Sequence, residues 1–371
     1  MKLTTCAPAE LPAALERVFA GDGVVAPLPG AGSEPVLAVV RPDLPVEEVA
    51  AGVVVATSGS TGNPKAVVLS ADAIAASARA THARLGGPGD WVCVLPTHHV
   101  AGLMTLARAV LAGRSVRFGA GDLSDLPSPA GRCYLSVVGA QLYRAVSDPA
   151  LLARLREYAV VLVGGSAVSP LLLRQVREAG VTLVTTYGMA ETCGGCVYDG
   201  LPLDGVRVGI EDGRVTLAGA MAFSGYRLDP GLTARVLRGD TVLTRDRGRL
   251  DGGRLEVTGR VDEVVVSGGV NVDLAEAQRV AEAVLGPPEA GGPVLLAVAD
   301  QRWGHKVVAV TTGASGLDVV VDALRGRLGP AALPKELRRV ASLAYTPTGK
   351  IDRRALARAW QRQGESDGDG R

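Results

Sequence analysis

The chain has 371 residues, 47% of them hydrophobic and 21% charged, which is enough for two domains with buried cores. Its 39 basic and 38 acidic residues leave a net charge of +1, which argues against binding nucleic acid or a membrane surface through a basic patch. No apolar signal segment, no run of about 18 apolar residues and no cysteine framework is evident, so we expect a cytoplasmic protein without membrane insertion.

Short β-branched runs alternate with amphipathic segments between residues 50 and 187. The runs predict buried strands at 53–57, 91–95, 134–138, 160–163 and 181–185. Helices are predicted at 70–85 and 169–179. In the second helix Ser169 is the expected N-cap, Pro170 the first helical residue and Gly180 the stop. Such alternation is typical of a mainly parallel sheet covered by helices.

The pattern changes after residue 188. Between 205 and 266 short runs are separated by Asp-Gly, Gly-Asp and Gly-Gly pairs, which predict antiparallel hairpins. A second α/β block follows, with a helix from Asp273 to Gly286, strands at 294–299 and 306–312, and helices at 317–328 and 352–362.

We therefore predict an α/β fold with two domains. The larger, residues 1–260, should hold a helix-covered, mainly parallel sheet and a small β-rich subdomain, and should bind ATP and the acyl group. The smaller, residues 263–362, should be a mobile α+β domain, and residues 363–371 a disordered tail because they are too polar to pack.

A dense cluster of glycines and hydroxyls lies between the apolar runs 53–56 and 66–69. It consists of Thr57, Ser58, Gly59, Ser60, Thr61, Gly62 and Lys65. Backbone N–H groups and hydroxyls in such a loop can bind phosphate oxygens, because glycine permits close approach and positive φ, and Lys65 adds a positive charge. An ordinary hairpin loop is the alternative. The segment is not a Walker A loop, since Ala66 follows the lysine.

This segment resembles the phosphate-binding loop of the adenylate-forming superfamily, which includes acyl- and aryl-CoA ligases, luciferases and peptide-synthetase adenylation domains. Further segments resemble the remaining motifs of that superfamily in the expected order: 187–192, 244–248, 259–263, 267–271, 300–304 and 347–353. Arg245 and Ala66 depart from the pattern, because each replaces a usual glycine. The short N-terminal part and residues 191–200 resemble actinobacterial o-succinylbenzoate–CoA ligases of menaquinone biosynthesis.

The resemblance implies an ATP-dependent ligase that adenylates an aromatic carboxylate, releases pyrophosphate and transfers the acyl group to CoA. ATP, CoA, Mg²⁺ and the carboxylate are the expected partners, and a homodimer is possible. The alternatives are another aryl- or acyl-CoA ligase and a non-catalytic protein that binds an acyl-adenylate. An amino-acid adenylation domain is disfavoured, because no Asp near residues 97–103 could bind an α-ammonium group.

The resemblance also implies roles for individual residues. Lys350 should bridge the carboxylate and the α-phosphate, Thr192 should donate to that phosphate, and Glu191 should bind magnesium. Tyr187, followed by Gly188, should cover one face of adenine, and Gly164, Gly165 and Ser166 should line the other. Asp246 should accept the ribose hydroxyls, with Arg260 nearby. Asp262 is the expected hinge. CoA should bind at Ser267, Gly268 and Gly269.

The acyl pocket is expected to include His99, Gly102, Met189, Cys193 and Gly194. His99 could instead be a structural histidine. Cys193 and Cys196 have the spacing of half a zinc site, but no second pair of ligands accompanies them, so we expect no zinc. The residue that pairs with the substrate's second carboxylate stays open.

Overall fold

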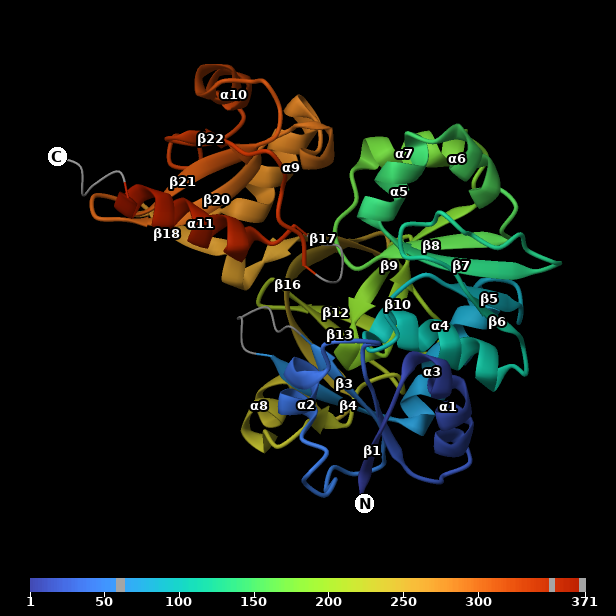
Figure 1. The fold of residues 1–371 in the computed structure, drawn as a ribbon. Coiled ribbons are helices and arrows are strands. Elements are labelled where there is room, and N and C mark those ends of the chain that lie inside the picture. Colours follow the sequence, from blue (N-terminus) through green and yellow to red (C-terminus); the bar gives the residue numbers. More distant parts are fainter. Residues whose placement is uncertain (58–63, 347–350, 367–371) are drawn as a thin grey trace. The chain divides into compact units, whose positions relative to one another are not determined.

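The computed structural model describes residues 1–57, 64–346 and 351–366 of the chain (Figure 1). Two compact units can be distinguished. The first contains residues 1–244 and 250–256, and the second contains 245–249 and everything from 257 onward. The boundary expected at residue 260 lies at the end of β17 (Arg254–Arg260), which passes from the first unit into the second after residue 256. Its partner strand β16 (Thr241–Asp251) also passes through the second unit, at residues 245–249.

One sheet of the first unit is mixed. Its order is β1 (Leu3–Cys6), β2 (Val24–Pro27), β3 (Ala51–Thr57), β4 (Lys65–Ser70) and β14 (Gly225–Tyr226). Strand 53–57, expected in one sheet with the later strands, lies in this mixed sheet instead, where β3 pairs parallel with β2. β3 and β4 pair antiparallel, with Thr57 opposite Lys65, so the chain turns back instead of crossing over a helix.

The second sheet of this unit has seven strands and confirms the predicted parallel arrangement. Its order is β11 (Leu201–Pro202), β10 (Gly194–Tyr198), β9 (Leu183–Met189), β8 (Val160–Gly164), β7 (Cys133–Val138), β5 (Asp90–Cys93) and β6 (Val116–Phe118). Strands β9, β8, β7, β5 and β6 are parallel, and β10 and β11 extend the β9 edge antiparallel.

Helices cover both sheets in layers. Between the sheets lie α1 (Leu11–Phe19), α3 (Ala71–Arg84) and α4 (Val100–Leu111), whose apolar side chains join those of β3 and β4 in one core. The other face of the mixed sheet packs on α2 (Glu34–Val40). On the outer face of the seven-stranded sheet are α5 (Gly139–Val146), α6 (Pro149–Leu155) and α7 (Pro170–Glu178) (Figure 1).

A β-rich region completes the first unit and confirms the expected hairpins. β12 (Arg207–Glu211) pairs with β13 (Arg214–Ala218), and β15 (Leu237–Arg238) with β16, all antiparallel. The short helix α8 (Pro230–Val236) begins at Asp229, whose carboxylate accepts the backbone N–H of Leu232. Among the described helices, none is both long and apolar enough to span a membrane.

The second unit is a sheet between helices. Its strands are β18 (Val264–Ser267), β19 (Val270–Asp273), β20 (Val294–Asp300), β21 (Gly304–Thr311) and β22 (Leu337–Arg339). Alternate residues of β20 face opposite sides: Leu295 packs with α9 (Leu274–Leu285) and α10 (Leu317–Leu324), whereas Leu296 packs with α11 (Arg353–Ser366).

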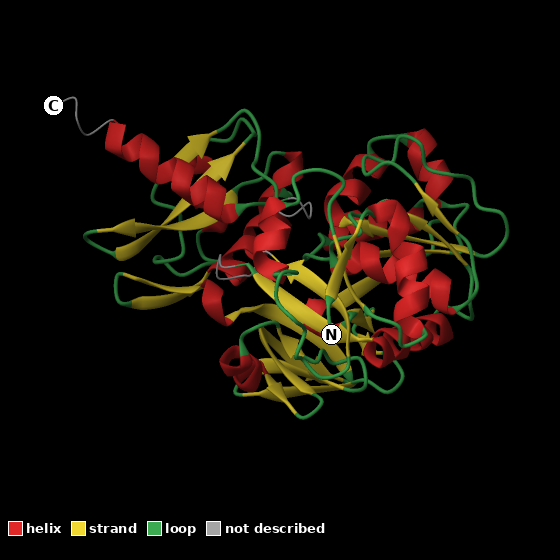
Figure 2. Cartoon of the chain, turned by 60° about the horizontal axis from the view of Figure 1, so that its bottom comes forward, coloured by secondary structure: helices red, strands yellow, loops and turns green. Residues whose placement is uncertain are grey.

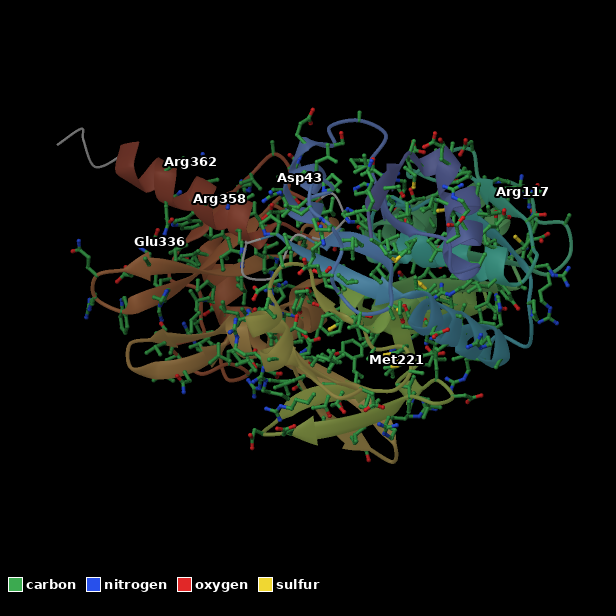
Figure 3. The ribbon with its side chains drawn as sticks, turned by 90° about the horizontal axis from the view of Figure 1, so that it is seen from below. Asp43, Arg117, Met221, Glu336, Arg358 and Arg362 are labelled. Carbon is green, nitrogen blue, oxygen red and sulfur yellow. The ribbon has the colours of Figure 1, made fainter. Side chains whose placement is uncertain are left out.

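Helix α11 is longer than the sequence suggested. It continues to Ser366, through residues that we had assigned to a disordered tail (Figure 2). Its apolar side buries Leu356 and Trp360, whereas Arg358 and Arg362 are exposed one turn apart (Figure 3). These packing contacts belong to the helix that the sequence predicted at 352–362.

Candidate active site

Several expected site residues lie outside the part of the chain that the structure describes. They are Ser58, Gly59, Ser60, Thr61, Gly62 and the expected catalytic lysine, Lys350. The ends of the predicted phosphate loop are described: Thr57 and Lys65 face each other at the ends of β3 and β4, and the Thr57 hydroxyl lies 3.4 Å from the Lys65 carbonyl oxygen.

Lys65 lies in a cluster that joins three distant segments of the chain. Its ammonium group is 5.1 Å from the centre of the Tyr226 ring on β14. The Tyr226 hydroxyl donates to the Glu191 carboxylate at 2.6 Å, and Glu191 sits in the 3₁₀ turn Ala190–Thr192 directly after β9. The structure thus brings together the expected phosphate-binding lysine and the expected magnesium ligand, with a tyrosine between them.

Tyr226 was missed by the sequence analysis. It belongs to a two-residue strand that pairs with β4, with Tyr226 opposite Val67. A strand this short has no periodic signal, and its place beside Lys65 depends on pairing between segments far apart in the chain. Only its position in the fold reveals it.

Thr192, the expected α-phosphate donor, is fully buried. Its hydroxyl accepts the backbone N–H of Met189 and lies 2.8 Å from the Gly194 carbonyl oxygen. In this conformation the Thr192 hydroxyl is hydrogen-bonded to backbone groups of its own turn. Donation to a phosphate remains a prediction, and it would require the hydroxyl to exchange one of these backbone partners.

The expected adenine-binding residues lie at neighbouring strand ends. Gly164 ends β8 and Gly165 and Ser166 follow it, while Tyr187 and Gly188 lie near the carboxyl end of the adjacent parallel strand β9. Ligands of open α/β sheets bind at such carboxyl ends. Gly164 has no room for a side chain, because a Cβ there would lie 2.3 Å from the Thr186 hydroxyl oxygen.

Backbone packing alone requires a glycine at position 188. A Cβ there would lie 2.1 Å from the Gly194 carbonyl oxygen on β10. Its place in the Tyr-Gly motif therefore reflects the close approach of β9 and β10.

The expected acyl-pocket residues form part of the protein interior around the start of α4. His99 precedes α4, and its ring centre is 4.2 Å from that of His98. Gly102 packs against the Pro96 carbonyl, where a Cβ would come within 2.4 Å. Cys193 is fully buried in the same core, and a Cβ on Gly194 would lie 3.5 Å from Met104.

Met189, the remaining expected acyl-pocket residue, is half-buried between two hydrophobic cores. Of the two glycines in this set, Gly102 leaves no room for a larger side chain, whereas a Cβ on Gly194 would make ordinary contact with Met104. Contact of the acyl-pocket residues with a substrate remains a prediction.

The two neighbouring cysteines pack in different cores, Cys193 against the α3–α4 layer and Cys196 with the β-rich region. Both thiols are free and buried. Burial raises the pKa of Cys193 well above its usual range and that of Cys196 to about 12, so both are protonated at neutral pH. Within the described ranges, no group of three or more His, Cys, Asp or Glu could hold a metal ion.

Asp246 and Arg260 form the centre of a charged network in the second unit. The Arg260 guanidinium donates to Asp246 at 2.7 Å and to Asp262 at 2.8 Å. Partial burial favours a higher pKa for the Asp262 carboxyl, but the hydrogen bond and charge of Arg260 outweigh it and lower that pKa below its ordinary value. Asp262 therefore stays ionised.

Arg245, the departure from the expected glycine, joins this network, with its guanidinium 3.5 Å from Asp262. The network thus places a second cation beside the expected hinge. Asp262 itself lies in the 3₁₀ turn Val261–Glu263, inside the second unit. Its hinge role remains a prediction.

The expected CoA-binding turn joins β18 to β19. The Ser267 side chain is fully buried, so only Gly268 and Gly269 present surface. Both glycines have positive φ, and a Cβ on Gly268 would lie 2.5 Å from the Trp303 ring. The turn and segment 300–304, which contains Trp303, thus pack directly on each other.

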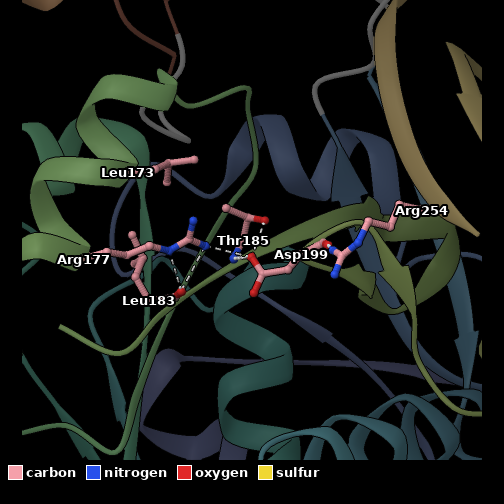
Figure 4. Close-up of a pocket in the computed structure, with 6 residues that line it drawn as sticks. All are labelled: Leu173, Arg177, Leu183, Thr185, Asp199 and Arg254. Atoms are coloured by element: carbon pink, nitrogen blue, oxygen red, sulfur yellow. Dashed lines mark hydrogen bonds and ion pairs between the residues drawn. The ribbon is translucent and has the colours of Figure 1, made fainter. Parts of the chain in front are cut away.

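A pocket of about 460 Å³ opens elsewhere in the first unit (Figure 4). Its lining comprises Leu173, Arg177, Leu183, Thr185, Asp199 and Arg254. The Asp199 carboxylate accepts from Arg177 and from Thr185, both at 2.9 Å, so the polar groups of the pocket bind one another. None of the residues expected to bind substrate lines it.

Comparison with known proteins accounts for the order of motifs. The family model described as AMP-binding enzyme matches residues 18–222, more than half of the chain. The chain belongs to the AMP-binding enzyme family. This AMP-binding enzyme is 40% identical to a "probable 2-succinylbenzoate–CoA ligase" of Mycobacterium tuberculosis over 95% of both chains.

Other relatives extend the comparison. A 2-succinylbenzoate–CoA ligase of Salmonella typhimurium is 32% identical over 81% of this chain and 67% of its own. An indoleacetate–CoA ligase of Aromatoleum aromaticum is 31% identical over 80% and 64%, respectively. Among solved structures, an E. coli MenE variant with bound OSB-AMS has a TM-score of 0.78 and 25% identity, covering 98% of this chain and 88% of that one. The fold is therefore the α/β fold of adenylate-forming enzymes.

Proposed function

We propose that this enzyme is an o-succinylbenzoate–CoA ligase of menaquinone biosynthesis. The observation that carries the proposal is the 40% identity to a ligase of that name across 95% of both chains. The similarity to MenE with a bound OSB-AMS supports the same substrate. The cluster of Lys65, Tyr226 and Glu191 supplies the charges that the chemistry needs.

The reaction has two steps. A carboxylate oxygen of the substrate attacks the α-phosphorus of ATP, the bond to the β-phosphate oxygen breaks, and pyrophosphate leaves. The CoA thiol, losing its proton, then attacks the acyl carbon, and AMP leaves. The first step joins two anions, so the protein must chiefly neutralise and align charge. We assign this role to Lys65 at the phosphate loop and to Lys350 at the reacting carboxylate.

The residues present fit magnesium. Glu191 supplies a carboxylate that shares Tyr226 as a neighbour with Lys65, and Mg²⁺ is commonly held by one or two carboxylates while the nucleotide phosphates and water complete its shell. Bound there, the ion would offset negative charge on the phosphates. In the same proposal Tyr187 and the 164–166 turn receive adenine, and Asp246, held by Arg260, accepts the ribose hydroxyls. A homodimer likewise remains a prediction.

The proposal is tested by a panel of carboxylates assayed with ATP and CoA. The panel contains o-succinylbenzoate, benzoate, indoleacetate and a fatty acid, and the acyl-CoA product and AMP are quantified by mass spectrometry. We expect the highest kcat/KM for o-succinylbenzoate. Preference for indoleacetate would favour the second candidate, a different aryl-CoA ligase, for which the relative in A. aromaticum is the specific observation. Binding of acyl-adenylate without turnover of any acid would indicate a non-catalytic protein.

A further inference from the structure

Tyr226 lies between the two charged side chains of the proposed nucleotide site. The residue is 5% exposed, and Phe223 packs edge-on against its ring with 4.9 Å between ring centres. The hydroxyl donates to Glu191 at 2.6 Å, a length typical of a strong hydrogen bond to a carboxylate. Lys65 lies over the same ring at 5.1 Å, within the range of a cation–π interaction. One side chain therefore contacts both groups.

The backbone around Tyr226 is fixed on both sides. The Tyr226 N–H donates to the Thr233 hydroxyl at 2.8 Å, and the Arg227 N–H donates to the carbonyl oxygen of Ala66, next to Lys65. The Phe223 N–H donates to the Glu191 carbonyl oxygen at 2.9 Å. The segment that carries Tyr226 is thus hydrogen-bonded to the backbone of Glu191 and to that of Ala66, the neighbour of Lys65.

A buried arginine anchors this segment further. The Arg227 side chain is fully buried, and its guanidinium donates to the Glu48 carboxylate at 3.1 Å. It also donates to the carbonyl oxygens of Val40, Arg41, Leu44 and Pro45. Such an anchor leaves Tyr226 little freedom to shift. The geometry of Glu191 and Lys65 relative to each other is therefore set through the tyrosine.

We propose that Tyr226 is a positioning residue for magnesium–nucleotide binding, which it serves by orienting the Glu191 carboxylate through its hydroxyl and Lys65 through its ring. The inference rests on the proposed function of this site. A hydrogen bond to one carboxylate oxygen fixes the plane of the group, so its remaining lone pairs point in one direction. Partners that orient metal ligands in this way commonly change metal affinity 10–100-fold when removed.

Tyr226→Phe tests the hydroxyl while keeping the ring against Phe223 and Lys65. We expect the affinity for ATP, measured by calorimetry in the presence of Mg²⁺, to fall about tenfold. Affinity for ATP in EDTA should change little. Tyr198→Phe is the matched control, because it also removes a buried tyrosine hydroxyl, one that is hydrogen-bonded to Thr81 at 3.0 Å away from these residues. Equal magnesium-dependent affinities for the two variants would overturn the proposal.

A double-mutant cycle locates the effect. In a Glu191→Gln background, Tyr226→Phe should cause no further loss of magnesium-dependent ATP affinity, because the carboxylate it orients is already gone. A full tenfold loss in that background would mean that the tyrosine acts elsewhere, and would also overturn the proposal. Both measurements use ATP alone. Failure of the enzyme to use o-succinylbenzoate would therefore refute the proposed substrate without affecting this test.

Discussion

Arg227 shows how a single residue can carry much of the stability around the site. Its guanidinium is fully buried and has five oxygen partners, four of them backbone carbonyls in residues 40–45. Removing it leaves those acceptors and Glu48 without their donor. A buried polar group that loses its partner costs far more than an exposed ion pair contributes.

We therefore expect Arg227→Met to lower the free energy of unfolding by about 3 kcal/mol. The control is Arg41→Met, which breaks an exposed pair with Asp43 and should change the free energy of unfolding far less, because solvent screens that pair. Urea unfolding followed by circular dichroism measures both. Similar losses for the two variants would contradict the anchoring role of Arg227.

His82 gives a prediction for pH. It is 7% exposed and lies 3.4 Å from the indole nitrogen of Trp91. Burial, with a smaller effect from the Arg108 charge, lowers its pKa from 6.5 to about 4. Between pH 6.5 and about pH 4, His82 is protonated in the unfolded chain but not in the folded one. The free energy of unfolding should therefore fall as the pH drops through this range.

His82→Gln should remove this contribution. Between pH 7 and pH 5 the wild type should lose about 2 kcal/mol more stability than the variant, from the two pKa values of the histidine. Urea titrations at both pH values measure the difference. Parallel losses in the two proteins would show that His82 titrates normally in the folded state.

At the residue scale, the sequence identified charged groups better than their partners. Lys65 and Glu191 could be selected because they stand in motifs with a chemical reason. Tyr226 could not be selected, because its contact with both depends on the pairing of β14 with β4. Arg245 was noted as a departure, but its position beside Asp262 required the structure.

Among the elements, strands β9 and β10 approach each other unusually closely. Gly188 and Gly195 face each other, and a Cβ on Gly188 would lie 2.1 Å from the Gly194 carbonyl oxygen. A backbone carbonyl cannot move aside for a new Cβ as the end of a flexible side chain can. The packing of the sheet alone therefore requires glycine at position 188.

Gly188→Ala should destabilise the first unit by about 3 kcal/mol, the upper end of the usual cost of overpacking. Gly30→Ala is the control, because nothing lies within 4 Å of a Cβ at that exposed position. Thermal unfolding and hydrogen exchange of the β10 amides measure the effect. A stable Gly188→Ala variant with protected β10 amides would refute this packing argument.

Local signals predicted elements well where capping residues were present. Asp273 accepts the N–H groups of Ala275 and Glu276 at the start of α9, and Gly286 with positive φ ends it, as the sequence indicated. The same signals could not assign β3 to its sheet. Sheet membership depends on which strand comes next in space, and for β3 that is an antiparallel hairpin partner.

For the whole molecule, the account requires the second unit to serve two half-reactions, with Asp262 as the hinge. Asp262→Pro should keep carboxylate-dependent ATP–pyrophosphate exchange and stop acyl transfer to CoA, because proline fixes φ and prevents the backbone change. Asp262→Ala, which loses the Arg260 and Arg245 pairs but keeps backbone freedom, should transfer the acyl group. An unchanged overall rate in Asp262→Pro would refute the hinge.

The fold class and the order of motifs could be predicted at this scale, because each segment carries its own pattern. The passage of residues 245–249 into the second unit could not, since β16 runs through both units without a break in composition. Nor could the extension of α11 to Ser366, because residues 363–366 are polar and include Gly364, a composition that favours a loop.

The central claim is that this enzyme activates o-succinylbenzoate as an adenylate. Exchange of labelled pyrophosphate into ATP tests it most directly. The account predicts exchange that depends on o-succinylbenzoate in the wild type and is lost in Lys350→Ala, while that variant still converts supplied o-succinylbenzoyl-adenylate and CoA to the thioester. Exchange that needs no carboxylate, or that persists in Lys350→Ala, would contradict it.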